Sequence, residues 1–439
     1  MKTFPERGVT VALLGLMTAT IASIWWPPGS LLAGVCALVL IPFALRVAER
    51  RTRLICLLLL SLGGAAMLAG SLLDRDALQP ALLGRLNQDL IAMMTGVAFV
   101  RLAVQTDGPN VAVRLRGVPG LVRTAVVTQV LGSILNMVAL GIVGDRLARR
   151  GSLSLADANL VARSYAIAAL WSPFWVVSAV ILATVPAANL GIIGVIGAAA
   201  AVLFLLLSTL QNARTRGPEL RDEPGFPFSA RLLIVPALLC AVVVAGHAVL
   251  PGTPVPRLVL LAAILVPLAV LLVGQGPRTA LRRFRVEGIG QLPRSANEAL
   301  LFVSAGVLSV GLAQLIEYFG VSIPGTAFTP WHAWGVTIAI VLGSLVGLHP
   351  LIAISVIAGL VLPLHPEPTL LGVAIAFGWG IAAPVGPISG VTVVLAQRYG
   401  VSNRAMVLGN LPYAAIGIVL ALGAVWAAGV VTGVVSLPG

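Results

Sequence analysis

The chain alternates long apolar runs with short loops that carry most of its basic residues. Many of these runs reach about 17–25 residues, the length that an α-helix needs to cross the hydrocarbon core of a bilayer. Hydrophobic residues make up 59% of the 439 residues and charged residues only 10%, a balance that soluble domains do not show. The alternation and polar content of a membrane β-barrel are missing. The sequence therefore predicts an all-α polytopic membrane protein.

We expect about eleven transmembrane helices and two further apolar stretches that form re-entrant hairpins. The expected helices are 9–26, 29–46, 53–73, 88–105, 160–186, 190–210, 231–250, 256–274, 297–318, 368–397 and 406–430. The expected hairpins are 124–144 and 333–363.

The distribution of basic residues favours hairpins over full spans in these two stretches. With a cytoplasmic N-terminus and two hairpins, all basic residues except Arg75, Arg85 and Arg257 fall in cytoplasmic loops or at cytoplasmic helix ends, as the positive-inside rule requires. Two full spans would instead place several basic loops outside. The net charge of +13 therefore reflects topology rather than nucleic-acid binding. We expect a multi-pass protein of a bacterial inner membrane, with its C-terminus in the periplasm.

Weak internal similarity divides the chain into two halves that keep the same order of motifs. The matched segments are 87–104 with 297–314, 131–133 with 342–344, 172–173 with 386–387, and Asn189 with Asn403, at offsets of 210, 211, 214 and 214. Because an odd number of spans separates the copies, the pattern predicts an inverted-topology repeat, which is common in secondary transporters. The expected parts are a leading helix at 1–28, repeats at 29–210 and 231–439, and a cytoplasmic linker at 211–230.

Helix breakers lie at matching positions in the two halves. The stretch IAAPVGPISG, residues 381–390, places two prolines and two glycines inside the expected helix 368–397, and LWSPF at 170–174 interrupts the expected helix 160–186. A broken helix exposes amide groups that suit an anion and carbonyl groups that suit a cation such as Na⁺. Matching breaks therefore point to a binding site near the middle of the membrane. The alternative is a pair of simple proline kinks without a binding site, which would produce the same sequence pattern.

Small and polar residues mark the turn of each expected hairpin. A turn at membrane depth needs small residues and side-chain oxygens, and these groups can either contact a substrate or only cap the hairpin arms. His349 either takes part in proton coupling or forms a neutral hydrogen bond inside the tip. The polar residues concerned are Thr128, Gln129, Ser133, Asn136, Ser344 and His349.

The sequence lacks the signatures of an enzyme. It contains no Gly-rich phosphate loop, zinc cluster or nucleophile elbow, and the loops between spans are short. No charged residue is expected in the middle of a span, so backbone dipoles, hydroxyls and amides would hold a substrate anion. We therefore expect no enzyme, no cofactor beyond a coupling Na⁺ or H⁺, and no nucleic-acid partner. A membrane-embedded glycan polymerase or lipid-modifying transferase is the alternative from another class.

This architecture resembles the ion transporter superfamily, which includes divalent anion:sodium symporters, citrate–metal symporters, arsenite permeases and the large membrane subunits of TRAP transporters. The resemblance covers nearly the whole chain: a leading helix, then two inverted halves with three spans, a hairpin, a broken helix and a final span each. Those symporters carry Ser-Asn-Thr at each hairpin tip. Here the corresponding places hold Gly132-Ser133 and Gly343-Ser344, and Asn136 lies near the first only.

The resemblance implies a homodimer with an elevator motion, in which hairpins and broken helices slide against a scaffold built largely from the spans before each hairpin. The expected substrate site, from the sequence patterns and the resemblance together, comprises Thr128, Gln129, Ser133, Asn136, Ser172, Pro173, Ser344, His349, Pro384, Gly386, Pro387, Ser389 and Thr392. The implied Na⁺ ligands are Gly132, Ser133, Ser172, Gly343, Ser344 and Gly386. The expected function is secondary active transport of a small carboxylate-type anion coupled to Na⁺ or H⁺. The alternative is a TRAP-like permease subunit that needs a separate periplasmic binding protein.

Overall fold

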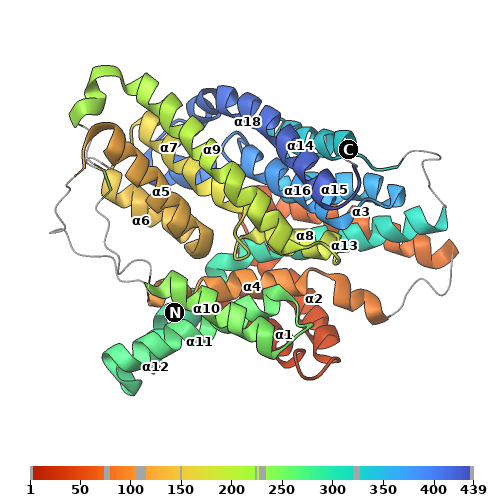
Figure 1. Ribbon diagram of the computed structural model, residues 1–439. Helices are drawn as coiled ribbons and strands as arrows, with labels where there is room; N and C mark the ends of the chain where they lie inside the picture. Colours follow the sequence, from red (N-terminus) through yellow and green to blue (C-terminus); the bar gives the residue numbers. More distant parts are fainter. Residues whose placement is uncertain are drawn as a thin grey trace. The chain divides into compact units, whose positions relative to one another are not determined.

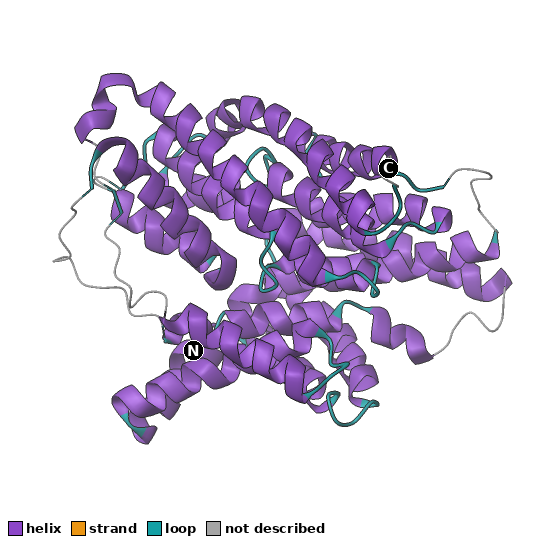
Figure 2. Ribbon diagram, viewed as in Figure 1, coloured by secondary structure: helices purple, strands orange, loops and turns teal. Residues whose placement is uncertain are grey.

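The computed structural model describes residues 3–73, 80–103, 115–148, 151–222, 225–226, 234–319 and 327–435. Within these ranges the regular elements are helices and no strand is present (Figure 2). Seven helices are long and apolar enough to cross a membrane. This part of the chain therefore confirms the predicted all-α, multi-pass membrane class.

Two compact units divide the chain, and each unit takes one segment from either side of residue 234. Unit 1 holds Met1–Val104 and Ile234–Ile323, and unit 2 holds Gln105–Leu233 and Pro324–Gly439. Unit 1 thus contains the helices that precede each hairpin, which is the division that the resemblance implies for a scaffold. Its helices are α1 Phe4–Ala22, α2 Gly29–Val47, α3 Arg50–Leu73, η2 Pro80–Arg85, α4 Gln88–Val97, η3 Val100–Leu102, α10 Ile234–Val249, α11 Val255–Gln275, α12 Pro277–Arg283, η7 Phe284–Gly288, η8 Ile289–Ser295 and α13 Ala296–Tyr318 (Figure 1).

Small residues let α3 and α13 pack closely in unit 1. A Cβ added to Gly63 would lie 2.6 Å from Leu308 Cα, and a Cβ added to Gly311 would collide with the carbonyl oxygen of Gly63. Membrane helices use such small residues to bring their backbones together, because apolar burial alone does not drive helices together in lipid. Elsewhere in the unit, α4 packs on α11, and Arg257 Nε donates to Asp89 Oδ2 across that contact at 2.9 Å.

Unit 2 contains both hairpins, both interrupted helices and the helix that follows each of them. Its helices are α5 Gly117–Leu135, α6 Val138–Leu147, α7 Leu155–Ala166, η4 Ile167–Leu170, α8 Val176–Thr184, α9 Leu190–Arg216, η5 Gly217–Asp222, α14 Pro330–Leu345, α15 Pro350–Val361, η9 Leu362–Leu364, α16 Pro368–Ala382, α17 Gly390–Tyr399 and α18 Asn403–Val431.

Helix packing in unit 2 repeats between its two sequence segments. Helix α5 contacts α7 and α9, just as α14 contacts α16 and α18. Contacts between the segments come in matching pairs as well, because α6 meets α17 where α15 meets α8, and α7 meets α18 where α9 meets α16. This pattern is what a two-fold pseudosymmetric arrangement produces.

The predicted spans and loops differ from the structure in three places. The predicted span 88–105 was wrong in its length, because α4 ends at Val97 and the amides of Phe99 and Leu102 then bond three residues back, in 3₁₀ turns. The predicted linker 211–230 begins in helical structure, because α9 continues to Arg216 and is followed by η5. The predicted helix 160–186 was wrong at its start, because α7 begins at Leu155, so Arg163 lies inside the helix rather than near its cytoplasmic end.

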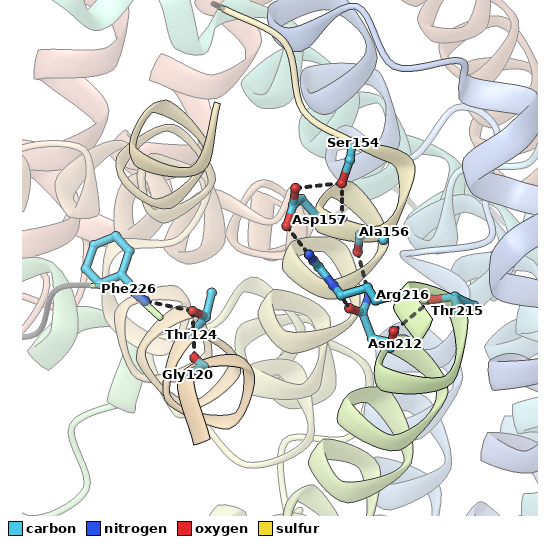
Figure 3. Close-up of polar contacts among 9 residues, drawn as sticks. All are labelled: Gly120, Thr124, Ser154, Ala156, Asp157, Asn212, Thr215, Arg216 and Phe226. Carbon is cyan, nitrogen blue, oxygen red and sulfur yellow. Dashed lines mark hydrogen bonds and ion pairs between the residues drawn. The ribbon is translucent and has the colours of Figure 1, made fainter. Parts of the chain in front are cut away.

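Polar contacts join the ends of α7 and α9 in unit 2 (Figure 3). Asp157, near the start of α7, forms an ion pair with Arg216 at the end of α9. The Asn212 amide donates to the carbonyl of Ala156 at 2.6 Å. Figure 3 also shows Phe226 beside α5, where its amide donates to Thr124 Oγ1 at 2.9 Å. A residue of the predicted linker is therefore bound to the first arm of the first hairpin.

Candidate functional site

Two helices of unit 2 are interrupted by short non-helical segments. In the first, η4 ends at Leu170 and α8 begins at Val176. In the second, α16 ends at Ala382 and α17 begins at Gly390. Proline causes both interruptions, because it lacks the amide hydrogen of a helical residue and its ring clashes with the preceding turn. We call residues 171–175 break 1 and residues 383–389 break 2.

Break 1 and break 2 share the same backbone pattern. The amide of Trp175 donates to the carbonyl of Ser172 at 3.2 Å, and the amide of Ser389 donates to the carbonyl of Gly386 at 3.1 Å. Trp175 and Ser389 are then the N-cap residues of α8 and α17, both with extended backbone. Each break is therefore followed by the start of a half-helix, which carries a partial positive charge.

In each break, one backbone carbonyl accepts a hydrogen bond from the hydroxyl of the residue six positions later in the chain. Ser178 Oγ donates to the carbonyl of Ser172 at 2.8 Å, and Thr392 Oγ1 donates to the carbonyl of Gly386 at 2.7 Å. Both residue numbers in the second contact exceed those in the first by 214 (392 against 178, 386 against 172). The two breaks are thus structurally equivalent segments of one repeated design.

Each hairpin turns at a residue with positive φ. Asn136, between α5 and α6, has φ 51°, and Gly347, between α14 and α15, has φ 94°. Glycine reaches positive φ without a steric penalty, and asparagine tolerates it better than most residues. The numbers of the two turn residues differ by 211 (347 against 136), which is also the offset of the matched Gly-Ser pairs just before them. The backbone therefore sets the position of both tips.

The first hairpin is hydrogen-bonded to the first interrupted helix. Ser172 in break 1 donates its hydroxyl hydrogen to the carbonyl of Ser133. Tyr165 on α7 donates to the Asn136 side-chain oxygen at the tip. A Cβ added to Gly132 would lie 2.8 Å from the Tyr165 ring, so the tyrosine ring packs directly against the hairpin backbone at Gly132. These contacts bring four of the expected site residues together.

The second hairpin meets break 2 mainly by packing. A Cβ added to Gly386 would lie 3.6 Å from Ser344 Cβ, which places this part of break 2 beside the end of α14. Farther from the tip, Thr337 Oγ1 donates to the carbonyl of Ala374 at 3.1 Å. The Ser344 hydroxyl is fully buried and has no hydrogen-bond partner among the described residues. A buried hydroxyl without a partner is costly.

The first hairpin also contacts the second interrupted helix. A Cβ added to Gly390, the first residue of α17, would lie 3.1 Å from Met137 Cε at the tip. At the other end of α17, Arg398 Nη2 and Asp145 Oδ2 lie 2.6 Å apart, and Tyr399 OH donates to Asp145 Oδ1 at 2.8 Å. Partial burial opposes ionisation of the Asp145 carboxyl, but the hydrogen bonds from Arg398 and Tyr399 outweigh it and lower its pKa.

A row of aromatic rings connects the two hairpin tips through both interrupted helices. The rings of Tyr165 and Trp175 have centroids 5.2 Å apart, and those of Trp175 and Trp379 are 6.3 Å apart and nearly perpendicular. Trp379 in turn meets His349 at 5.9 Å. The indole Nε1 of Trp175 is buried and has no hydrogen-bond partner in the part of the chain that the structure describes. This donor belongs to break 1, whereas the Ser344 hydroxyl lies beside break 2.

His349 acts as the N-cap residue of α15. Its Nδ1 accepts a hydrogen bond from the amide of Leu351 at 3.2 Å. Because an amide can only donate, Nδ1 carries no proton in this arrangement. Of the two roles considered for this histidine, the geometry favours the neutral, hydrogen-bonded one.

Several expected ligands already use their polar groups inside the site. The hydroxyls of Ser172, Ser389 and Thr392 each donate to a backbone carbonyl. In break 2 the carbonyls of Pro384 and Pro387 each accept a side-chain amide hydrogen at 2.9 Å. These residues therefore shape the breaks, and their oxygens keep only their remaining lone pairs for a substrate or a cation.

Three other expected site residues, Thr128, Gln129 and Pro173, take no part in these contacts. Thr128 and Gln129 are buried on α5, about two helical turns before the tip. Thr128 Oγ1 donates to the carbonyl of Thr124 at 2.7 Å, whereas the Gln129 side chain makes no hydrogen bond to the described residues. Pro173 lies in break 1 and serves to interrupt the helix.

Sequence reasoning missed a buried polar network next to the site. Arg163 on α7 is only 4% exposed, and its Nε donates to Asn410 Oδ1 on α18 at 2.6 Å. Asn410 in turn donates to the carbonyl of Pro384 in break 2 and, at 3.1 Å, to Asn159 Oδ1. One signal was available, because Arg163 directly precedes a long apolar run, where a charge is unusual.

Comparison with known proteins gives a likeness in fold alone. No family model matches the chain. No curated protein matches its sequence. A crystal structure of the YdaH transporter of Alcanivorax borkumensis, reported to have an unusual topology, superimposes with a TM-score of 0.57 at 16% identity, over 86% of this chain and 97% of that one. The chain therefore has a fold similar to that of this crystal structure.

Proposed function

We propose that this protein is a secondary active transporter of a small, carboxylate-type organic anion, coupled to Na⁺ or H⁺. The observation that carries the proposal is the meeting of two equivalent helix breaks with two hairpin tips inside unit 2. Such a junction offers half-helix starts for an anion and carbonyl oxygens for a cation. The fold of the YdaH transporter supports a transport role.

Two buried donors without partners among the described residues support an anion site at the junction. Trp175 Nε1 and Ser344 Oγ are buried without partners, so each gains a hydrogen bond when an acceptor such as a carboxylate oxygen arrives. The half-helix starts at Val176 and Gly390 add fixed positive partial charge. A Na⁺ ion would bind to the free lone pairs of nearby carbonyl and hydroxyl oxygens.

The division of the chain into two units suggests how the site changes its exposure. All site residues belong to unit 2, while unit 1 holds only the helices before each hairpin. We propose that unit 2 moves as a body against unit 1, an elevator-type motion, and carries the bound anion with it. Under this mechanism the hydrogen bonds inside unit 2 persist through the cycle.

Uptake by purified protein in liposomes tests the function. Monocarboxylates, dicarboxylates and citrate would be supplied with a Na⁺ gradient, a proton gradient or neither. We expect at least one carboxylate to accumulate only when a gradient is present. Accumulation of neutral or cationic solutes alone would contradict the proposal.

Two conservative substitutions test the site. Trp175→Phe keeps an aromatic ring but removes the indole donor, and Ser344→Ala removes the orphan hydroxyl. Since neither group has a hydrogen-bond partner among the described residues, we expect normal folding and a loss of uptake. Ser208→Ala on α9 is the matched control, because the Ser208 hydroxyl is also buried without a partner. Normal uptake by both site variants would rule out this assignment.

A further inference from the structure

Arg163 is a buried cation whose partners in the described part of the chain are all uncharged. Its guanidinium donates to Asn410 Oδ1 at 2.6 Å, to Gln211 Oε1 at 3.0 Å and to the carbonyl of Gly409 at 2.8 Å. The ring of Tyr413 lies beneath it, with the centroid 5.0 Å from Cζ. Amide dipoles and one aromatic face are thus the compensation that the structure provides for a full positive charge.

Stability does not explain such an arrangement. Burying a charge without an opposite charge costs free energy, and apolar residues of similar size usually serve a fold equally well or better. Ionisable residues inside a membrane protein are correspondingly rare and tend to have functional roles. The neighbouring cation of the same unit behaves differently, since Arg216 is paired with Asp157.

A single amide connects Arg163 to break 2. Asn410 is fully buried, and the hydrogen bond from Arg163 fixes its oxygen toward the guanidinium. The amide nitrogen of Asn410 must then point the other way, where it donates to the carbonyl of Pro384 at 2.9 Å. The cation therefore lies behind break 2, with one side chain between them, and it orients that side chain.

We infer that Arg163 is a positioning and charge-selecting residue, whose fixed positive charge makes the site at break 2 selective for anions. This inference rests on the proposed function and deepens it. In a medium of low polarity the field of an uncompensated charge reaches past its direct neighbours. Arg163 does not need to touch the substrate, because its charge favours an anion over a neutral or cationic solute at the break.

Gln211→Glu is the decisive variant. It keeps the size of the side chain and the oxygen that accepts from Arg163, but it adds the missing negative charge beside the guanidinium. The contact of Arg163 with Asn410 stays in place. If the uncompensated charge attracts the substrate, this variant raises KM for the transported carboxylate by about tenfold or more with little change in kcat. It also raises Tm, because a buried charge becomes paired.

A purely structural role for Arg163 predicts a different outcome. A brace between α7, α9 and α18 would be strengthened by Gln211→Glu, so Tm would rise while KM stayed within about twofold of wild type. That result, or a Tm below that of wild type, would overturn the inference. Thr215→Glu adds the same charge to an exposed position on α9 and is the control, expected to leave KM unchanged.

Substitution of Arg163 itself separates charge from shape. Arg163→Lys keeps the charge and is expected to retain carboxylate uptake in part, whereas Arg163→Gln is expected to lose it at low substrate concentration. Equal loss in both variants, with both proteins folded, would count against a role for the charge. If the wild type carried no carboxylate, the proposed function would fail, while the rise in Tm of Gln211→Glu would still decide whether Arg163 is uncompensated.

Discussion

The hydroxyl of Ser172 donates a hydrogen bond to the carbonyl of Ser133, and this contact ties break 1 to the first hairpin. Both residues are 1% exposed. The equivalent place in the second half lacks the contact, because Gly386 occupies the position that matches Ser172, and the Ser344 hydroxyl has no partner within the described ranges. Break 1 and break 2 therefore share a backbone pattern, but the contact of break 1 with its hairpin is the stronger one.

We predict that Ser172→Ala destabilises the protein by about 1–3 kcal/mol, because it removes a buried hydrogen bond and leaves the Ser133 carbonyl without that donor. Ser208→Ala is expected to cost far less, since the Ser208 hydroxyl is fully buried without any partner to lose. Unfolding of both variants in detergent, followed by circular dichroism, measures the difference. Equal losses would mean that the Ser172 contact contributes nothing of its own.

The two hairpin tips should also differ in local opening. We predict faster amide hydrogen exchange at the second turn, around Gly347, than at the first turn, around Asn136, because side-chain hydrogen bonds hold the first. Exchange measured by mass spectrometry on peptides from both turns tests this. In Tyr165→Phe, which removes the bond to Asn136, the first turn should exchange faster while the second is unchanged. Equal protection of both turns in the wild type would contradict the prediction.

The sequence could locate the helices and breaks because composition carries that information. Long apolar runs mark helices that cross a bilayer, and prolines within them mark interruptions, as at Pro384 and Pro387. The offsets between the halves were also readable, and the contacts Ser178–Ser172 and Thr392–Gly386 now follow one of them. The span 88–105 went wrong because apolar content does not distinguish an α-helix from the 3₁₀ turns that end α4.

The partners of the site residues could not be read from the sequence. Ser172, Ser389 and Thr392 look like ligands in a sequence, but folding directs their hydroxyls to backbone carbonyls. Nothing in the order of residues says that Arg163 meets Asn410, because 247 positions separate them. The role of a polar side chain inside a membrane domain depends on such distant neighbours.

Close contact between α9 and break 1 depends on Gly197. A Cβ at this position would overlap the backbone carbonyl of Leu170, just before break 1. We therefore predict that Gly197→Ala destabilises unit 2 by about 1–3 kcal/mol through overpacking, despite the better helix propensity of alanine. Gly423→Ala on α18 is the control, because a Cβ there meets nothing within 4 Å; it should stabilise by up to about 1 kcal/mol. Thermal unfolding of both variants measures the effect of each substitution on stability. A Gly197→Ala protein as stable as the Gly423→Ala control would show that the helices can move apart at no cost in stability.

The ion pair between Asp145 and Arg398 predicts a dependence of stability on pH. Its hydrogen bonds lower the pKa of the Asp145 carboxyl below the ordinary value of 3.8, so the contribution of the pair is present above pH 3.8 and is lost as the pH falls through the lowered pKa. Both side chains are more than half exposed, which limits the contribution to about 0–1 kcal/mol.

Asp145→Asn should therefore be slightly less stable than wild type at pH 7, and this difference in stability should vanish at a pH well below 3.8. In the Asp145→Asn background, Arg398→Gln should cause no further loss, because the partner of Arg398 is already gone. A difference between wild type and Asp145→Asn that grew on acidification would mean that this carboxyl is stabilised in its protonated form instead.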